Sequence, residues 1–262
     1  MKSVLEFKAR KPAGAKISMV SAYTHWEARF LATSPVDCIL VGDSLTVVLD
    51  GDPLTFAATT EIMARHTRAV ARGAGGKLVI ADFPFLAARR GVGYAVDCAA
   101  ELLRVGANAV KIEGVDGHED VLAHLVQSGV PVLGHIGLTP QSIHALGGYR
   151  VQGKNEAAAT DLVRQAHAAE AAGCFGLVLE CMPPEVAREI TAAVGIPTIG
   201  IGAGADTDGQ VLVFHDLLGL NPHFNTRFMR RFADGATVVA DGLAAYAEAV
   251  AKGKYPGKKE SY

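Results

Sequence analysis

The sequence predicts an α/β fold, a TIM (β/α)8 barrel built as a single domain. Short apolar segments rich in β-branched residues alternate with amphipathic segments about eight times along the chain. The apolar segments are almost continuously hydrophobic, as expected of parallel strands that are buried on both faces. The length of 262 residues suits one barrel, which takes about 250 residues. A doubly wound parallel sheet has the same alternation, and periodicity alone does not exclude it.

The elements follow from this alternation in chain order. The expected strands cover residues 17–22, 38–41, 77–81, 109–112, 132–134, 176–179, 198–201 and 211–214. Between them apolar residues recur at intervals of three and four, the spacing of an amphipathic helix. The expected helices cover residues 24–33, 60–72, 93–105, 119–128, 156–171 and 185–194. Glycines just after these segments indicate helix ends.

No linker or low-complexity segment divides the chain, so residues 1–262 are expected to form one barrel domain. Residues 137–155 are rich in glycine and polar side chains and predict a long loop after the fifth strand. From about residue 221 we expect a C-terminal helical extension that ends in a flexible tail.

Composition excludes several classes of partner. The chain has 25 Lys and Arg against 27 Asp and Glu, a formal net charge of −2, so nothing favours binding to nucleic acid or an anionic membrane. No apolar run is long enough to span a bilayer, and the first residues lack the apolar core of a signal peptide. The cysteines, without a CxxC pair, are interpreted as reduced thiols of a cytoplasmic protein. A disulfide or a zinc site is the alternative.

Ionisable side chains follow five successive apolar segments. They are Asp43, Asp82, the pair Lys111 and Glu113, His135, and Glu180. The carboxyl ends of barrel strands form one face, where catalytic groups lie, so these side chains are expected at one rim. Lys111 and Glu113 are two residues apart in a strand and therefore point the same way.

Three of these residues predict a metal site. Asp43, Asp82 and Glu113 offer oxygen ligands without a cysteine, the donor type that suits Mg²⁺. Three carboxylates at one mouth also repel each other unless a cation lies among them. The alternative interpretation is that they cap helices or pair with Lys and Arg.

Glu180 and His135 are candidates for proton transfer. Glu180 lies between Leu179 and Cys181, and an apolar setting suits a general base. His135 lies close to Gly134 and Gly137, which leave room for a ligand. An ion pair for Glu180 and a structural role for His135 remain open on this evidence.

The glycine-rich stretch at residues 200–205 loosely fits the GxGxxA pattern of dinucleotide-binding proteins. That fingerprint belongs in the first βαβ unit, with an acidic residue about 20 positions further on. Here it follows the seventh strand, which favours a loop whose backbone approaches a ligand.

Seven motifs occur in order along the chain and together carry a specific resemblance. They are VGDSL at 41–45, ADFPF at 81–85, GANAVKIEG at 106–114, GHIGLTPQS at 134–142, GGYRVQG at 147–153, LEC at 179–181 and IGIGAG at 199–204. On these motifs the chain resembles the ketopantoate (3-methyl-2-oxobutanoate) hydroxymethyltransferase family of the phosphoenolpyruvate/pyruvate barrel superfamily. The likeness runs from about Ser18 to Tyr255 and Pro256.

The resemblance implies a transferase of pantothenate biosynthesis. It implies transfer of a hydroxymethyl group from 5,10-methylenetetrahydrofolate to 3-methyl-2-oxobutanoate, which gives 2-dehydropantoate, with Mg²⁺ as the cofactor. It also implies a homo-oligomer, typically a homodecamer. The residues implied around the metal are Asp43, Asp82 and Glu113. The residues implied at the substrate are Asp43, Ser44, Asp82 and Lys111. The residues implied in catalysis are Glu180 as the base, Lys111 and His135.

The chain departs from the family pattern at the mouth. Thr24 stands where the family usually has Asp, and Asp52 where it usually has His, and residues 55–59 read TFAAT instead of TLPVT. Because the loop after the second strand is expected near the mouth of the barrel, a difference in folate handling or in substrate size is expected from these changes. Two other functions remain open: a related Mg²⁺-dependent enzyme that acts on a C–C bond of another 2-oxo acid, and a non-catalytic oligomeric binder.

Overall fold

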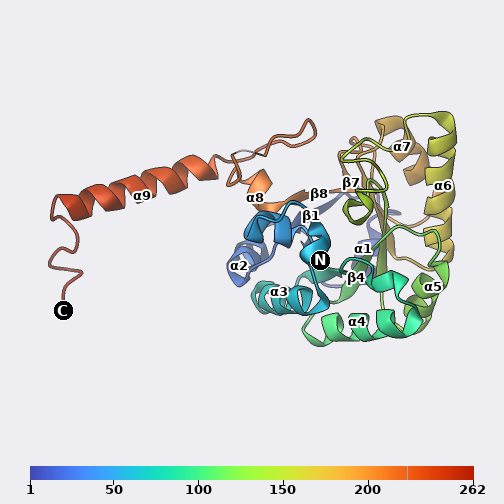
Figure 1. Cartoon of the computed structure of the whole chain (residues 1–262), viewed down its shortest axis with the longest axis horizontal. Coiled ribbons are helices and arrows are strands. Elements are labelled where there is room, and N and C mark those ends of the chain that lie inside the picture. Colours follow the sequence, from blue (N-terminus) through green and yellow to red (C-terminus); the bar gives the residue numbers. More distant parts are fainter. Residues whose placement is uncertain (223) are drawn as a thin grey trace. The chain divides into compact units, whose positions relative to one another are not determined.

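The core of the protein is a closed barrel of parallel strands. In the computed structural model, which describes residues 1–222 and 224–262, the strands follow one another around the barrel in chain order (Figure 1). They are β1 (Ile17–Ser21), β2 (Cys38–Val41), β3 (Leu78–Asp82), β4 (Ala109–Glu113), β5 (Val132–Gly137), β6 (Gly176–Glu180), β7 (Thr198–Ile201) and β8 (Gly209–Val213). The predicted TIM barrel is confirmed, and a doubly wound sheet is excluded because the sheet closes.

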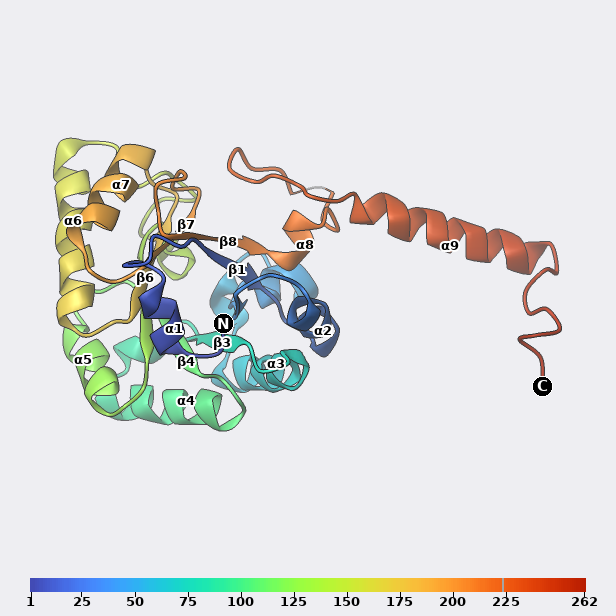
Figure 2. The same ribbon diagram turned by 180° about the vertical axis from the view of Figure 1, so that it is seen from behind.

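Helices surround the barrel on the outside (Figure 2). They are α2 (His25–Thr33), α3 (Thr60–Gly73), α4 (Val92–Arg104), α5 (Glu119–Gln127), α6 (Glu156–Ala171) and α7 (Pro184–Ala193). A further helix, α1 (Val4–Ala9), lies across the amino-terminal end of the barrel. Side chains that accept from backbone N–H groups fix where several begin, such as Thr24 before α2 and Asn155 before α6. Such caps satisfy N–H groups that have no partner inside the helix.

Short elements fill the loops at the carboxyl ends of β2, β3 and β5. They are the π-helical turn η1 (Thr46–Asp50) and the 3₁₀ turns η2 (Thr55–Ala57), η3 (Ala87–Arg89) and η4 (Pro140–Ser142). The sequence predicted neither these turns nor α1, because elements of one or two turns leave little periodicity to detect. The predicted strands and the helices α2 to α7 are present, with ends that coincide or differ by at most three residues.

Apolar side chains fill the amino-terminal end of the barrel. Phe7, from α1, packs edge-on against Phe175 with ring centroids 5.1 Å apart. Both belong to a buried cluster with residues near the beginnings of the strands, including Ile17, Leu78 and Leu133. Because apolar side chains fill this end of the barrel, the polar side chains of the strands lie at the carboxyl end.

The chain divides into two compact units, residues 1–212 and 213–262. The second unit contains α8 (Phe214–Leu217) and α9 (Gly235–Ala251). The sequence predicted one domain with a helical extension from about residue 221. In the described residues between 221 and 234 no helix forms, and α9 begins at Gly235 because Asp234 accepts from the backbone N–H of Thr237 and caps it.

The described residues include no helix with the length and apolar character needed to cross a membrane. Cys38, Cys98, Cys174 and Cys181 are all free thiols. Burial raises the pKa of the Cys38 thiol to about 12, and the neighbouring carboxylate of Asp37 adds to this effect. Such a thiol stays protonated and unreactive, which fits the interpretation of reduced, buried cysteines.

Candidate active site

The predicted ionisable residues come together at the carboxyl rim. Asp82, Glu113 and Glu180 are the last residues of β3, β4 and β6. The parallel register places Asp82 beside Lys111 and Glu113 beside His135 on neighbouring strands. The strand register thus brings these carboxylates, Lys111 and His135 together at the carboxyl ends of the strands.

Lys111 lies at the centre of this group. Its ammonium Nζ is 3.1 Å from Oδ1 of Asp82 and 3.8 Å from Oε1 of Glu113, which confirms that Lys111 and Glu113 share a face. Burial acts to lower the pKa of Lys111, but the carboxylates of Asp82, Glu113 and Asp43 outweigh it and raise the pKa above its usual range. The buried ammonium is therefore permanently charged.

His135 connects two carboxylates. Its Nδ1 is 3.6 Å from Oε1 of Glu113, and its Nε2 is 3.3 Å from Oε2 of Glu180. Nζ of Lys111 is 3.2 Å from the same Nδ1. Burial and the charge of Lys111 act to lower the pKa of His135, whereas contacts with Glu113 and Glu180 prevail and raise it.

Glu180 is the acid with most access to the mouth. Its side chain is 18% exposed, whereas those of Asp82 and Glu113 are 3% and 4% exposed. A group that exchanges protons with a ligand must reach it, and a fixed partner such as His135 holds the carboxylate in place. This position suits a general base.

Asp43 follows β2 and lies buried beside Asp82. Its backbone N–H donates to Oδ2 of Asp82 at 3.0 Å. Burial raises the pKa of the Asp43 carboxyl well above its usual range, and the charges of Glu113 and Asp82 raise it further. Burial also raises the pKa of Asp82, although Lys111 opposes this. The single positive charge of Lys111 therefore does not balance the negative charges of the carboxylates at this rim.

The donor set fits a divalent cation in part. Oδ1 of Asp82 and Oε1 of Glu113 are buried and face the ammonium of Lys111 at 3.1 Å and 3.8 Å, without a hydrogen bond of good geometry in the described part of the chain. Across residues 1–222 and 224–262, however, no three His, Cys, Asp or Glu side chains already surround a common point as metal ligands. Lys111 lies between Asp82 and Glu113, which separates them. Mg²⁺ needs only one or two protein carboxylates, since water and substrate oxygens fill its other positions.

Ser44 is held at the same rim by a residue that the sequence did not single out. The hydroxyl of Tyr23, a fully buried residue, lies 2.8 Å from Oγ of Ser44. A Cβ at position 42 would lie 2.8 Å from this Oγ, so Gly42 keeps the space open. The signal for Tyr23 was its position directly after the first predicted strand.

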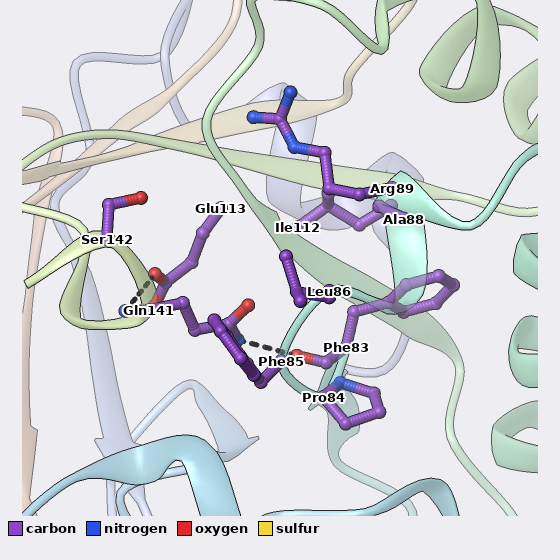
Figure 3. Close-up of a pocket in the computed structure, with 10 residues that line it drawn as sticks. All are labelled: Phe83, Pro84, Phe85, Leu86, Ala88, Arg89, Ile112, Glu113, Gln141 and Ser142. Carbon is purple, nitrogen blue, oxygen red and sulfur yellow. Dashed lines mark hydrogen bonds between the residues drawn. The ribbon is translucent and has the colours of Figure 1, made fainter. Parts of the chain in front are cut away.

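Gln141 lies within one of the seven sequence motifs, but no role was predicted for it from the sequence. It lies on η4 and lines a pocket beside Glu113, with side chains from the loops after β3 and β5 (Figure 3). The aromatic and apolar residues of this pocket include Phe83, Phe85 and Leu86. Phe56 stacks on Phe85 with ring centroids 4.2 Å apart.

Two of the departures from the family pattern have visible contacts in the structure, whereas nothing in the structure explains Asp52. Thr24 caps α2 in a reciprocal arrangement with Glu27. Phe56, within the altered 55–59 segment, supports the pocket through Phe85.

In the glycine-rich stretch, Gly200 packs against Thr207 and Gly204 against Pro184. A Cβ would approach these residues to 2.8 Å at position 200 and to 2.7 Å at position 204. These two glycines are explained by packing.

Fold and site together define an α/β-barrel protein with a candidate acid–base site at the carboxyl ends of its strands. The family model for ketopantoate hydroxymethyltransferase matches residues 2–258. A relative from Bdellovibrio bacteriovorus, called 3-methyl-2-oxobutanoate hydroxymethyltransferase, is 47% identical over 262 residues, 100% of each chain. The chain therefore belongs to the ketopantoate hydroxymethyltransferase family, and it is a transferase.

Solved structures of other enzymes share the fold at low identity. One is 2,3-dimethylmalate lyase, described as a member of the PEP mutase/isocitrate lyase superfamily, with a TM-score of 0.60 and 15% identity over 100% of this chain and 92% of that one. Another is phosphonopyruvate hydrolase in complex with oxalate and Mg²⁺, with a TM-score of 0.64 and 12% identity over 99% of this chain and 93% of that one. At such identities the likeness concerns the fold.

Replacing Lys111 by Met is expected to lower the free energy of unfolding by about 3–5 kcal/mol, because the buried carboxylates then lose their counter-charge. Urea unfolding in metal-free buffer measures the change. Lys252→Met removes a surface pair with Glu248 and is the matched control, expected to have little effect. A Lys111→Met protein as stable as the control would show that the ammonium does not hold the acids together.

Proposed function

We propose that this chain transfers a hydroxymethyl group from 5,10-methylenetetrahydrofolate to 3-methyl-2-oxobutanoate, which gives 2-dehydropantoate. Family membership supports the reaction class. The observation that carries the mechanism is the chain of contacts from Lys111 through His135 to Glu180, with separations of 3.2 Å and 3.3 Å. These contacts place the positive charge of Lys111 and the partly exposed carboxylate of Glu180 at the same end of the barrel.

Glu180 is the proposed base. It takes the proton from C3 of the 2-oxo acid, and the electrons of that C–H bond move toward the keto oxygen. Lys111, which stays charged, stabilises the negative charge that develops there. C3 then forms the bond to the methylene carbon while one C–N bond of the folate breaks and the keto group forms again. Water replaces the second nitrogen at that carbon, which gives the hydroxyl group of the product and releases tetrahydrofolate. The two nitrogens that leave take up the proton from C3 and a proton from water. His135 holds Glu180 in orientation throughout.

The carboxylates of Asp43, Asp82 and Glu113 are proposed to hold Mg²⁺. Their burial and mutual repulsion favour a cation at this place,. The phosphonopyruvate hydrolase structure, which contains Mg²⁺, supports this choice by analogy of fold. A bound Mg²⁺ would polarise the keto group and lower the cost of negative charge on its oxygen. Ser44, with Asp43, Asp82 and Lys111, is proposed to bind the substrate.

The test is hydrogen exchange at C3 of 3-methyl-2-oxobutanoate, followed by NMR in deuterated water with Mg²⁺ and without folate. The wild type should exchange this hydrogen. Glu180→Gln should slow the exchange by at least about 100-fold, the size expected for removing a general base. Glu185→Gln is the control, because Glu185 lies close in sequence but is exposed.

Each alternative function predicts a different result. Exchange that survives Glu180→Gln removes Glu180 from the role of base. No exchange by the wild type favours a non-catalytic binder. Exchange without 2-dehydropantoate after methylenetetrahydrofolate is added favours an enzyme that acts on another 2-oxo acid.

We further propose that the chain forms a homo-oligomer, a homodecamer by resemblance. Apolar side chains on one face of α9 support this. Val239, Leu243, Tyr246 and Val250 follow the helical spacing of three and four, and none of the residues of α9 is buried. A helix face of this kind is normally covered by another protein surface.

Light scattering after size exclusion tests the assembly. The wild type is expected at ten times the chain mass of 27.4 kDa, and Leu243→Glu is expected to shift the mass to smaller species. Asp241→Arg, which lies on the opposite side of α9 by helical spacing, should leave the mass unchanged. A wild type that elutes as a monomer would contradict the proposal.

A further inference from the structure

Gln141 joins two of the buried carboxylates. Its backbone N–H donates to Oε2 of Glu113 at 2.9 Å, and its side-chain Nε2 donates to Oδ2 of Asp43 at 2.8 Å. Nε2 also donates to the backbone oxygen of Phe83 at 2.8 Å. One residue thus links the segments that follow β2, β3 and β5 to the end of β4.

The orientation of the Gln141 amide is fixed by these contacts. Both acceptors of Nε2, a carboxylate oxygen and a carbonyl oxygen, require a donor, so the NH₂ group must face them and the amide oxygen must face away. Figure 3 shows the contact with Phe83 and the contact of the backbone with Glu113. Both amide hydrogens of Gln141 are therefore used, in the bonds to Asp43 and Phe83.

Gln141 also selects which carboxylate oxygens remain available. It engages Oδ2 of Asp43 and Oε2 of Glu113, one oxygen of each acid. The second oxygen of Glu113, Oε1, is buried and lies 3.8 Å from Nζ of Lys111 and 3.6 Å from Nδ1 of His135, and in the described part of the chain it accepts no hydrogen bond. An uncharged donor that holds one oxygen of a carboxylate fixes the direction in which the other oxygen points.

We propose that Gln141 is a positioning residue that orients Asp43 and Glu113 toward a divalent cation. The inference rests on the proposed metal site, and it adds Gln141 as the residue that holds the metal-binding carboxylates in place before the cation binds. Partners of this kind around metal ligands are typically worth about 10–100-fold in metal affinity. The side chain of Gln141 acts on Asp43, whereas its backbone N–H acts on Glu113, so a substitution at 141 tests mainly the Asp43 contact.

The experiment is Mn²⁺ binding, followed by the electron paramagnetic resonance signal of the free ion, without substrates. Gln141→Met keeps the length of the side chain and removes both donors. We expect it to weaken Mn²⁺ binding by about 10–100-fold, with the temperature of unfolding little changed. Gln165→Met is the matched control, because the amide of Gln165 donates to a carboxylate oxygen of Asp161 on the exposed face of α6.

The outcomes separate this inference from the metal site itself. If the wild type binds no Mn²⁺, the metal site is wrong. If the wild type binds Mn²⁺ and Gln141→Met binds it within about twofold as well, Gln141 does not position the ligands. If Gln141→Met does not fold, Gln141→Asn, which keeps the amide but is one methylene too short to reach both acceptors, is expected to show the same loss. Failure of both variants to fold would make Gln141 structural and overturn the proposal.

Discussion

A single buried ammonium organises the carboxyl end of this barrel. Lys111 is 3.1 Å from Asp82 and 3.8 Å from Glu113 in a place that water scarcely reaches. Taking charges out of water is costly, and the cost is offset only by good geometry and additional hydrogen bonds. The parallel register supplies that geometry, since Asp82 pairs with Lys111 across β3 and β4. The position of each acid, and of His135 beside them, follows from this constraint.

The balance of charge at the rim explains what the site is suited to do. Asp43, Asp82, Glu113 and Glu180 face one lysine, so the site has a surplus of negative charge that burial makes expensive. A surplus of this kind favours a divalent cation and a substrate that approaches it through oxygen atoms. Glu180 stands apart because it is the more exposed acid and contacts His135 on the side away from Lys111. The acids therefore divide into a buried group that binds and one reachable group that accepts a proton.

Much of this arrangement could be predicted from the sequence. The alternation of apolar and amphipathic segments gave the barrel, and the ionisable residues directly after the apolar segments gave the rim. Tyr23 and Gln141 were missed because their roles depend on contacts across the fold: Tyr23 reaches Ser44 and Gln141 reaches Asp43, far along the chain. The beginning of α9 was also missed, because it depends on the cap that Asp234 provides and not on the apolar pattern.

We propose that the buried acids around Lys111 hold a divalent cation together with a 2-oxo acid. The most direct test is anomalous diffraction from crystals grown with Mn²⁺ and 3-methyl-2-oxobutanoate. We expect one Mn²⁺ peak per chain in contact with carboxylate oxygens of Asp43, Asp82 and Glu113, with Lys111 still beside Asp82. A site without a peak, or a peak bound by other residues, would contradict it.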